Sequence, residues 1–154
     1  MLTVIVIVAI LIATAVPVLT HLSRAGGLNS AVRQVSNSAA LARQYAITHR
    51  TQVELRITNT WDAVSVYTNV GPTAAQLDKW NYFPPGIIVD PGASTNSVIF
   101  TPTGGTTADR EMRIVVREGS IVPGTPTTLF GVTSNRAVIA INHILGKISI
   151  NRPQ

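Results

Sequence analysis

Three histidines and seven acidic side chains are the residues of this 154-residue chain that could do metal or acid–base chemistry. His21, His49 and His143 are scattered, and none has a carboxylate at the spacing that shared metal ligation requires. The chain has no cysteine, which excludes disulfides, thiolate metal sites and cysteine nucleophiles together. The acidic residues fall mostly in expected loops or on solvent-facing strand positions, where paired acid–base work has no support. The pattern therefore predicts no metal site, no cofactor and no enzyme.

Two glycine-containing segments invite comparison with phosphate-binding loops. Gly104-Gly105 and Gly146-Lys147 both lack the rest of the P-loop pattern, and Lys147 is followed by isoleucine rather than serine or threonine. The chain also lacks the Gly-x-Ser-x-Gly segment of a serine hydrolase. We interpret both glycine segments as turns.

The net charge of +5 is concentrated in the first fifty residues. Residues 1–50 hold four arginines and no acidic residue, whereas residues 51–154 hold eight basic and seven acidic side chains. The arginines of the first part are Arg24, Arg33, Arg43 and Arg50, at spacings of nine, ten and seven and without interleaved aromatic residues. A binding surface for single-stranded nucleic acid would alternate basic residues with aromatic residues. We favour a solvated or subunit-facing helix surface.

The chain begins with an apolar segment, residues 1–19, and no Asp, Glu, Lys or Arg occurs before Arg24. As a helix, 19 residues reach about 28 Å, close to the hydrocarbon thickness of a bilayer. In lipid, helix is the only form that satisfies the backbone of a single segment. We expect a membrane-spanning helix that Pro17 weakens or bends locally, with a break near the membrane exit, because proline lacks an N–H group and clashes with the preceding turn. The residues expected to carry membrane insertion and assembly are Val4, Ile7, Ile10, Leu11 and Pro17.

Two other interpretations of the apolar segment stay open. A cleaved secretory signal is one, since Ala13-Thr14-Ala15 supplies a small-x-small cleavage site, although the basic start of a signal is absent. An ordinary single-pass anchor is the other. If the segment is a cleaved signal, the rest of the chain would be a secreted β-sandwich binding module.

A second helical pattern follows the pair Gly26-Gly27, which we expect to be flexible, and covers residues 28–50. Apolar and small residues recur there at intervals of four, three, four, three and four, which places them on one face of a helix. Polar residues such as Arg33, Gln34 and Gln44 lie opposite, so this part is amphipathic. The residues expected to pack against the rest of the chain are Leu28, Val32, Val35, Ala39, Ala42 and Ala46.

After Arg50 the hydrophobic period falls to two, which predicts strands over residues 51–154. Residues 53–57 and 61–67 form an expected hairpin, and short Val- and Ile-rich segments follow between Pro-, Gly- and Thr-rich turns. In the segment 111–119, Met112, Ile114 and Val116 are expected to be buried, and Arg113, Val115 and Arg117 to face water. The prediction is an α+β fold: a long N-terminal helix, transmembrane and then amphipathic, packed on a C-terminal antiparallel β-sheet or sandwich domain.

Aromatic residues surround the Pro84-Pro85 turn. Trp61, Trp80, Tyr82 and Phe83 could form an exposed patch there that binds a ligand. We favour packing in the core or against loops.

The chain resembles the type IV pilin and type II secretion pseudopilin superfamily. The segment VIVIVAILIATAVPVL, residues 4–19, is similar to the apolar assembly segment of that superfamily, which ends in proline. More narrowly, SAALARQYAITHRTQVELRI (residues 38–57), the Phe-x-Pro-x-Gly segment in VIFTPTGG (residues 98–105), and Gly146-Lys147 resemble the GspH/FimT minor pseudopilins.

The resemblance implies a structural subunit that the N-terminal helix assembles into a secretion pseudopilus or a type IV pilus-like filament. The implied partners are other pilin subunits, inner-membrane assembly machinery and membrane lipid, with the β domain on the extracytoplasmic side. Nucleic acid is a further candidate partner, because some FimT-like minor pilins capture DNA in competence. Lys147 and Arg152 are the candidate contacts here, and they are the basic residues of the last strand and tail.

The residues that prepilin peptidase recognises in this superfamily do not occur in the sequence. They are a basic leader ending in glycine, then phenylalanine and, a few residues later, glutamate. With Pro17 aligned to the proline of the superfamily, Met1 falls directly after the expected glutamate. We expect this leader to lie upstream of Met1.

Overall fold

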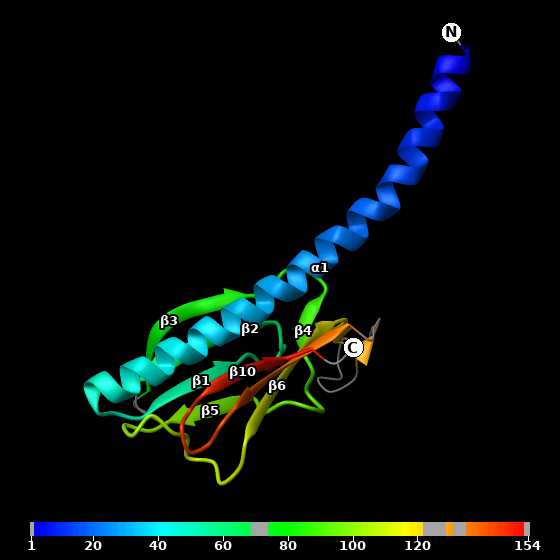
Figure 1. The fold of residues 1–154 in the computed structure, drawn as a ribbon. Coiled ribbons are helices and arrows are strands. Elements are labelled where there is room, and N and C mark those ends of the chain that lie inside the picture. Colours follow the sequence, from blue (N-terminus) through cyan, green and yellow to red (C-terminus); the bar gives the residue numbers. More distant parts are fainter. Residues whose placement is uncertain (1, 69–73, 122–128, 131–134, 153–154) are drawn as a thin grey trace.

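A 48-residue helix, α1 (Leu2–His49), leads into antiparallel strands (Figure 1). The computed structural model describes the backbone of residues 2–68, 74–121, 129–130 and 135–152, and the side chains of residues 26–68, 74–120 and 135–152. Figure 1 shows the second half of α1 lying along the strands, while the first half runs out beyond them. The helix therefore has one part that belongs to the folded domain and one part that leaves it.

The described strands form two four-stranded antiparallel sheets and one two-stranded pair. The first sheet has the order β3-β2-β1-β5, the second has the order β10-β9-β6-β4, and the pair is β7-β8. The strands are β1 (Val53–Ile57), β2 (Ala63–Thr68), β3 (Ala75–Tyr82), β4 (Ile87–Val89), β5 (Ser97–Phe100), β6 (Met112–Glu118), β7 (Ser120–Ile121), β8 (Leu129–Phe130), β9 (Arg136–Ile141) and β10 (Ile148–Asn151).

The core lies where α1 meets both sheets. The largest fully buried side chains come from the helix (Val32, Val35), the first sheet (Leu55, Phe100) and the second (Ile114), among others. Helix α1 contacts β1 and β2 of the first sheet and β6 and β9 of the second. Without a disulfide, this shared apolar core is the main source of stability for the domain. The predicted α+β class, with the helix packed on antiparallel sheets, is confirmed.

Helix α1 continues without interruption through Pro17 and through Gly26-Gly27, so the break expected near Pro17 is wrong. A proline inside a helix removes one hydrogen bond, and a smooth bend can absorb its ring without ending the helix. Figure 1 shows α1 as a curved rod. Gly27 is buried, and a Cβ atom there would lie 3.4 Å from Pro84 and from Ile87, so the glycine lets the helix approach the start of β4 closely.

Strand β3 has no apolar alternation, and sequence periodicity did not predict it. It forms an edge of the first sheet, pairs with β2 through two register shifts and has no buried residue. An edge strand with polar residues such as Asp78 and Lys79 buries little and so lacks the period-two signal.

Val115 in β6 was predicted to face water and is buried. The loop that follows β4 continues along the edge of β6: the N–H group of Asp90 donates to the Val115 carbonyl over 2.8 Å, and the N–H group of Val115 donates to Ser94 Oγ over 2.8 Å. Arg117, also predicted to face water, is partly buried in an ion pair with Asp90, over 2.7 Å. The periodicity of a strand does not show contacts such as these, which come from a loop elsewhere in the sequence.

Candidate functional site

The residues expected to insert into the membrane, Val4, Ile7, Ile10, Leu11 and Pro17, lie outside the described side chains. The backbone there is helical and belongs to α1. Among the residues whose side chains the structure describes, which exclude residues 1–25, no helical stretch is long and apolar enough to cross a membrane.

The structure places all six residues expected to pack against the β domain in the core. Leu28, Val32, Val35, Ala39, Ala42 and Ala46 are between 0% and 5% exposed. The last three of them along the helix are alanines, which let the helix axis lie near the sheets because a methyl group fills little space. The helix is therefore fixed to the domain along a narrow, closely packed stripe.

The opposite face of α1 remains exposed over the same length. Its exposed positions are Asn29, Arg33, Asn37, Ala40, Leu41, Gln44 and Ile47, which follow helical spacing. This face mixes polar, small and apolar residues, in contrast to the apolar stripe beneath it. The folded domain thus leaves one side of the helix open to other molecules.

Three segments that resemble the GspH/FimT pattern meet at the end of α1. Arg43 Nε donates to the Gly104 carbonyl over 3.1 Å, across 61 residues of sequence. Gly146 has φ of 60°, and a Cβ atom there would clash with the same carbonyl and lie 3.0 Å from Arg43 Nε. A Cβ atom at Gly105 would meet the His143 carbonyl at 2.7 Å. We call Arg43, Gly104, Gly105 and Gly146 the helix-end junction.

The helix-end junction joins the helix to both sheets. Its glycine loop follows Phe100 of β5 in the first sheet, and Gly146 lies in the turn between β9 and β10 of the second. The N–H group of Thr106 donates to the His143 carbonyl over 2.8 Å, which ties the loop to the turn directly. The Phe-x-Pro-x-Gly segment and Gly146 therefore have a structural role that spacing in the sequence did not show.

Removing the Arg43 side chain tests the helix-end junction. Arg43→Ala deletes a partly buried, charge-assisted hydrogen bond and is expected to lower the free energy of unfolding by about 1.5–3 kcal/mol. Arg33→Ala is the matched control, because Arg33 is exposed on the same helix, and its effect should stay within about 0.5 kcal/mol. Thermal unfolding of the full chain in detergent, followed by the fluorescence of Trp61 and Trp80, measures both. Equal shifts would contradict a stabilising role for the Arg43 bond.

The candidate nucleic-acid contacts Lys147 and Arg152 are both exposed and flank the edge strand β10. Lys147 lines a groove together with Arg43, and Arg152 is not among the residues that line it. The structure therefore does not gather the two candidates into one basic groove.

The four aromatic residues near Pro84 do not form one exposed patch. Phe83 is buried, Trp61 packs against the core, and Trp80 is half-buried with its ring 6.1 Å from that of Tyr67. Tyr82 is 64% exposed. The aromatic residues thus serve mainly as packing.

Two partly buried ion pairs fix charged side chains on the sheets. Arg117 pairs with Asp90, and Arg56 pairs with Glu54, each over 2.7 Å. The side-chain hydrogen bond to Glu54 raises the pKa of Arg56, and its guanidinium lies 4.5 Å from the centre of the Tyr67 ring. Among the described residues, no group of three or more His, Asp or Glu side chains could hold a metal ion.

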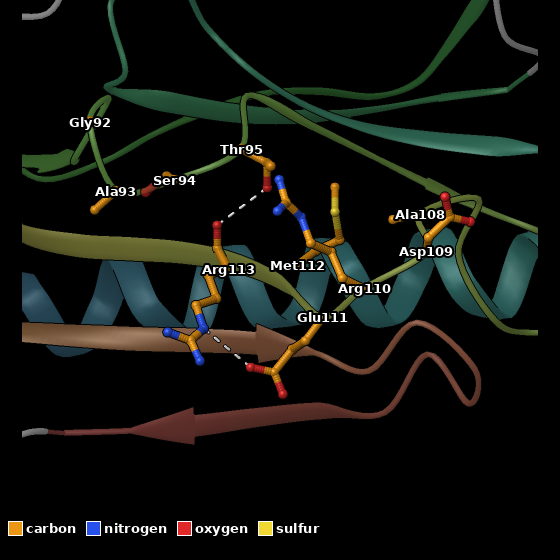
Figure 2. A pocket seen from close by; sticks show the side chains of 10 residues that line it. All are labelled: Gly92, Ala93, Ser94, Thr95, Ala108, Asp109, Arg110, Glu111, Met112 and Arg113. Carbon is orange, nitrogen blue, oxygen red and sulfur yellow. Dashed lines mark hydrogen bonds and ion pairs between the residues drawn. The ribbon is translucent and has the colours of Figure 1, made fainter.

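A pocket of about 1010 Å³, which sequence reasoning did not predict, opens between residues 92–95 and residues 108–113 (Figure 2). Figure 2 shows Arg113 reaching Glu111 with its side chain, an ion pair of 3.2 Å, while its carbonyl accepts a bond from Thr95 Oγ1 over 3.2 Å. Both ion-pair partners are well exposed, so the pair contributes little to stability. The pocket mixes both charge signs and shows no preference for one ligand class.

The arrangement of a long helix, half packed into two antiparallel sheets and half projecting from them, defines the pilin-like class of fold. The minor pilin FimU of Pseudomonas aeruginosa has this fold: its structure covers 86% of the chain and 97% of its own length, with 19% identity and a TM-score of 0.66. The minor pseudopilin EpsH of the Vibrio cholerae type 2 secretion system covers 82% and 97%, with 10% identity and a TM-score of 0.58.

The profile of the family described as type II transport protein GspH matches residues 31–142. The chain belongs to this GspH family. The matched range holds Arg43 and the Gly104-Gly105 loop of the helix-end junction, whereas Gly146 lies beyond it. No curated protein matches the chain.

Proposed function

We propose that the chain is a minor pilin-type subunit of a type II secretion pseudopilus or a type IV pilus-like filament, assembled through the first part of α1. The supporting observation is the division of α1 (Figure 1): its second half is packed into the β domain, and its first half leaves the domain with an apolar sequence. Membership of the GspH family supports a structural, pilin-like subunit that contacts other pilin subunits in the cell envelope.

In this proposal residues 1–19 hold the subunit in the inner membrane before assembly. Extraction then exchanges lipid contacts for contacts with the helices of neighbouring subunits. Exposing a helix of this size to water would cost on the order of tens of kcal/mol, at about 0.8 kcal/mol per CH₂ group. A subunit therefore leaves lipid only together with partners and with energy from an assembly machine.

The arginines of the first fifty residues fit this location. Arg24 follows the apolar segment after four residues, and Arg33 is on the exposed face of α1. Beyond the end of the membrane-spanning segment they would meet phospholipid headgroups before extraction and neighbouring subunits after it. Their spacing along the helix suits contacts with several partners rather than one compact site.

Charges in the apolar segment test the proposal. Ile7→Asp and Ile10→Asp, alone and combined, are expected to abolish stable membrane insertion, because each aspartate at the centre of a membrane helix costs about 2.5–3.5 kcal/mol. Membrane fractionation, followed by isolation of filaments, measures insertion and incorporation in turn.

Leu41→Asp is the matched control, since Leu41 is exposed on the part of α1 that lies against the β domain. It should fractionate with membranes as the unaltered chain does. Normal fractionation of the combined Ile7→Asp and Ile10→Asp variant would overturn the proposed anchor. A mature protein that begins after Ala15, found by mass spectrometry, would instead support secretion by cleavage.

A further inference from the structure

The turn between β9 and β10 carries two apolar side chains in water. Ile144 is 69% exposed and Leu145 is 61% exposed, the first and third highest values among the large apolar residues that the structure describes as exposed. Exposed single apolar residues are common, but two adjacent ones at the tip of a turn beside a groove are typical of a binding surface.

Hydrogen bonds hold this turn in one shape. Asn142 Oδ1 accepts bonds from the N–H groups of Ile144 and Leu145, each over 3.0 Å. The N–H group of Gly146 donates to the Asn142 carbonyl over 2.8 Å, and the Asn142 N–H group donates to the Lys147 carbonyl over 3.0 Å. The helix-end junction also holds this turn against α1, through the contacts of Gly146 with Gly104 and Arg43. The surface is therefore preorganised, and binding of a partner would cost little conformational entropy in this turn.

A groove of about 660 Å³ opens between this turn and the last turns of α1. Leu145 and Ile47 line it from opposite sides, and Ile47 is also exposed. The charged residues that line the groove are Arg43 and Lys147, and both are basic. The groove thus combines apolar walls with positive charge.

We infer that the groove lined by Ile47, Leu145 and Lys147, together with the adjacent exposed Ile144, is a docking surface for an apolar, acidic patch on a different pilin-type subunit. Charge complementarity favours a carboxylate beside Lys147. A second copy of this chain is disfavoured because each copy carries a net charge of +5. Nucleic acid is disfavoured because apolar tips such as Ile144 offer phosphates no contact. The inference rests on the proposed function, since it places the partner in the same filament.

Site-specific cross-linking tests the docking surface, because the absence of cysteine makes a single introduced thiol unique. The full chain with Leu145→Cys carries a benzophenone maleimide and is irradiated in membranes that contain the other subunits of its filament. Tyr82→Cys is the matched control, since Tyr82 is as exposed but belongs to β3 of the other sheet. We expect an adduct with a different pilin-type subunit, at least tenfold stronger from position 145 than from position 82. The cross-linked peptide should contain Asp or Glu beside apolar residues.

Charge reversal gives a second measurement. Lys147→Glu, combined with Leu145→Cys, should lower the adduct yield about tenfold, whereas Lys147→Arg should preserve it. Lys79→Glu, an exposed reversal on β3, should also preserve it. The unfolding temperature of each variant should stay unchanged, which excludes unfolding as the cause of the loss.

The outcomes separate this inference from the proposed function. Incorporation of the chain into filaments without an adduct at position 145, or with equal yields from positions 145 and 82, overturns the docking surface alone. An adduct with a second copy, lipid or nucleic acid also overturns it and identifies the occupant. Absence of the unaltered chain from filaments overturns the proposed function, and the docking surface with it.

Discussion

Replacing Gly146 by alanine is expected to lower the free energy of unfolding by about 2–4 kcal/mol, equivalent to about 5–15 °C in unfolding temperature for a chain of this size. Two effects add. The φ of 60° at Gly146 costs an L-residue about 1 kcal/mol, and the new Cβ atom would clash with the Gly104 carbonyl, a backbone group that cannot rotate away. Relief of the clash requires the turn or the glycine loop to move, and this movement removes the Arg43 hydrogen bond.

Gly86→Ala separates the two effects. Gly86 also has a positive φ, 78°, but a Cβ atom there would meet nothing within 4 Å. Its replacement should therefore report conformational strain alone, about 1 kcal/mol. Unfolding of the full chain in detergent, followed by the fluorescence of Trp61 and Trp80, measures both variants. If Gly146→Ala and Gly86→Ala lower the free energy of unfolding equally, the contact between Gly146 and Gly104 does not stabilise the domain.

Periodicity in the sequence predicted the parts of the fold in which local pattern and burial coincide. The buried stripe of α1 follows intervals of three and four residues, and the strand from Val53 to Ile57 follows an interval of two. The structure buries both of these faces. The sequence pattern did not predict strand β3, because its residues are mostly polar and an edge strand buries little surface. The short strands β7 and β8, two residues each, carry too few positions for any period.

The sequence did not predict the helix-end junction, for a different reason. Arg43, Gly104 and Gly146 are far apart in sequence, and each is compatible with an ordinary surface or turn position when considered alone. Only the pairing of β5 with β1 and of β9 with β10 brings the two glycine turns to the end of α1. The family resemblance pointed to these residues without giving a physical reason, and the close backbone contacts now supply one.

The docking groove depends on that same junction. The charge of Lys147 suggests a contact for nucleic acid, whereas the structure places it in a groove with the apolar Ile47 and Leu145 as well as the basic Arg43. Ile47 and Leu145 lie far apart in the sequence, so no sequence window shows them together. The helix-end junction, which joins the end of α1 to both sheets, therefore also forms one side of the groove that we propose as the docking surface for a neighbouring subunit.

Enlarging the alanine stripe of α1 is the second change with a large expected effect. Ala42→Leu should lower the free energy of unfolding by about 2–3 kcal/mol, because Ala42 is 0% exposed and the extra methylene groups have no space between helix and sheets. Leucine and alanine have similar helix propensities, so the loss reports packing rather than helix formation. The same fluorescence unfolding experiment measures it.

Ala40→Leu provides the control on the same helix, two residues away. Ala40 is exposed, and its replacement should change the free energy of unfolding by no more than about 0.5 kcal/mol. A loss at position 42 and none at position 40 would show that small residues keep α1 close to both sheets. Similar effects at the two positions would mean that the stripe tolerates larger side chains. The distance between helix and domain would then have to be set elsewhere, for which the helix-end junction is the next candidate.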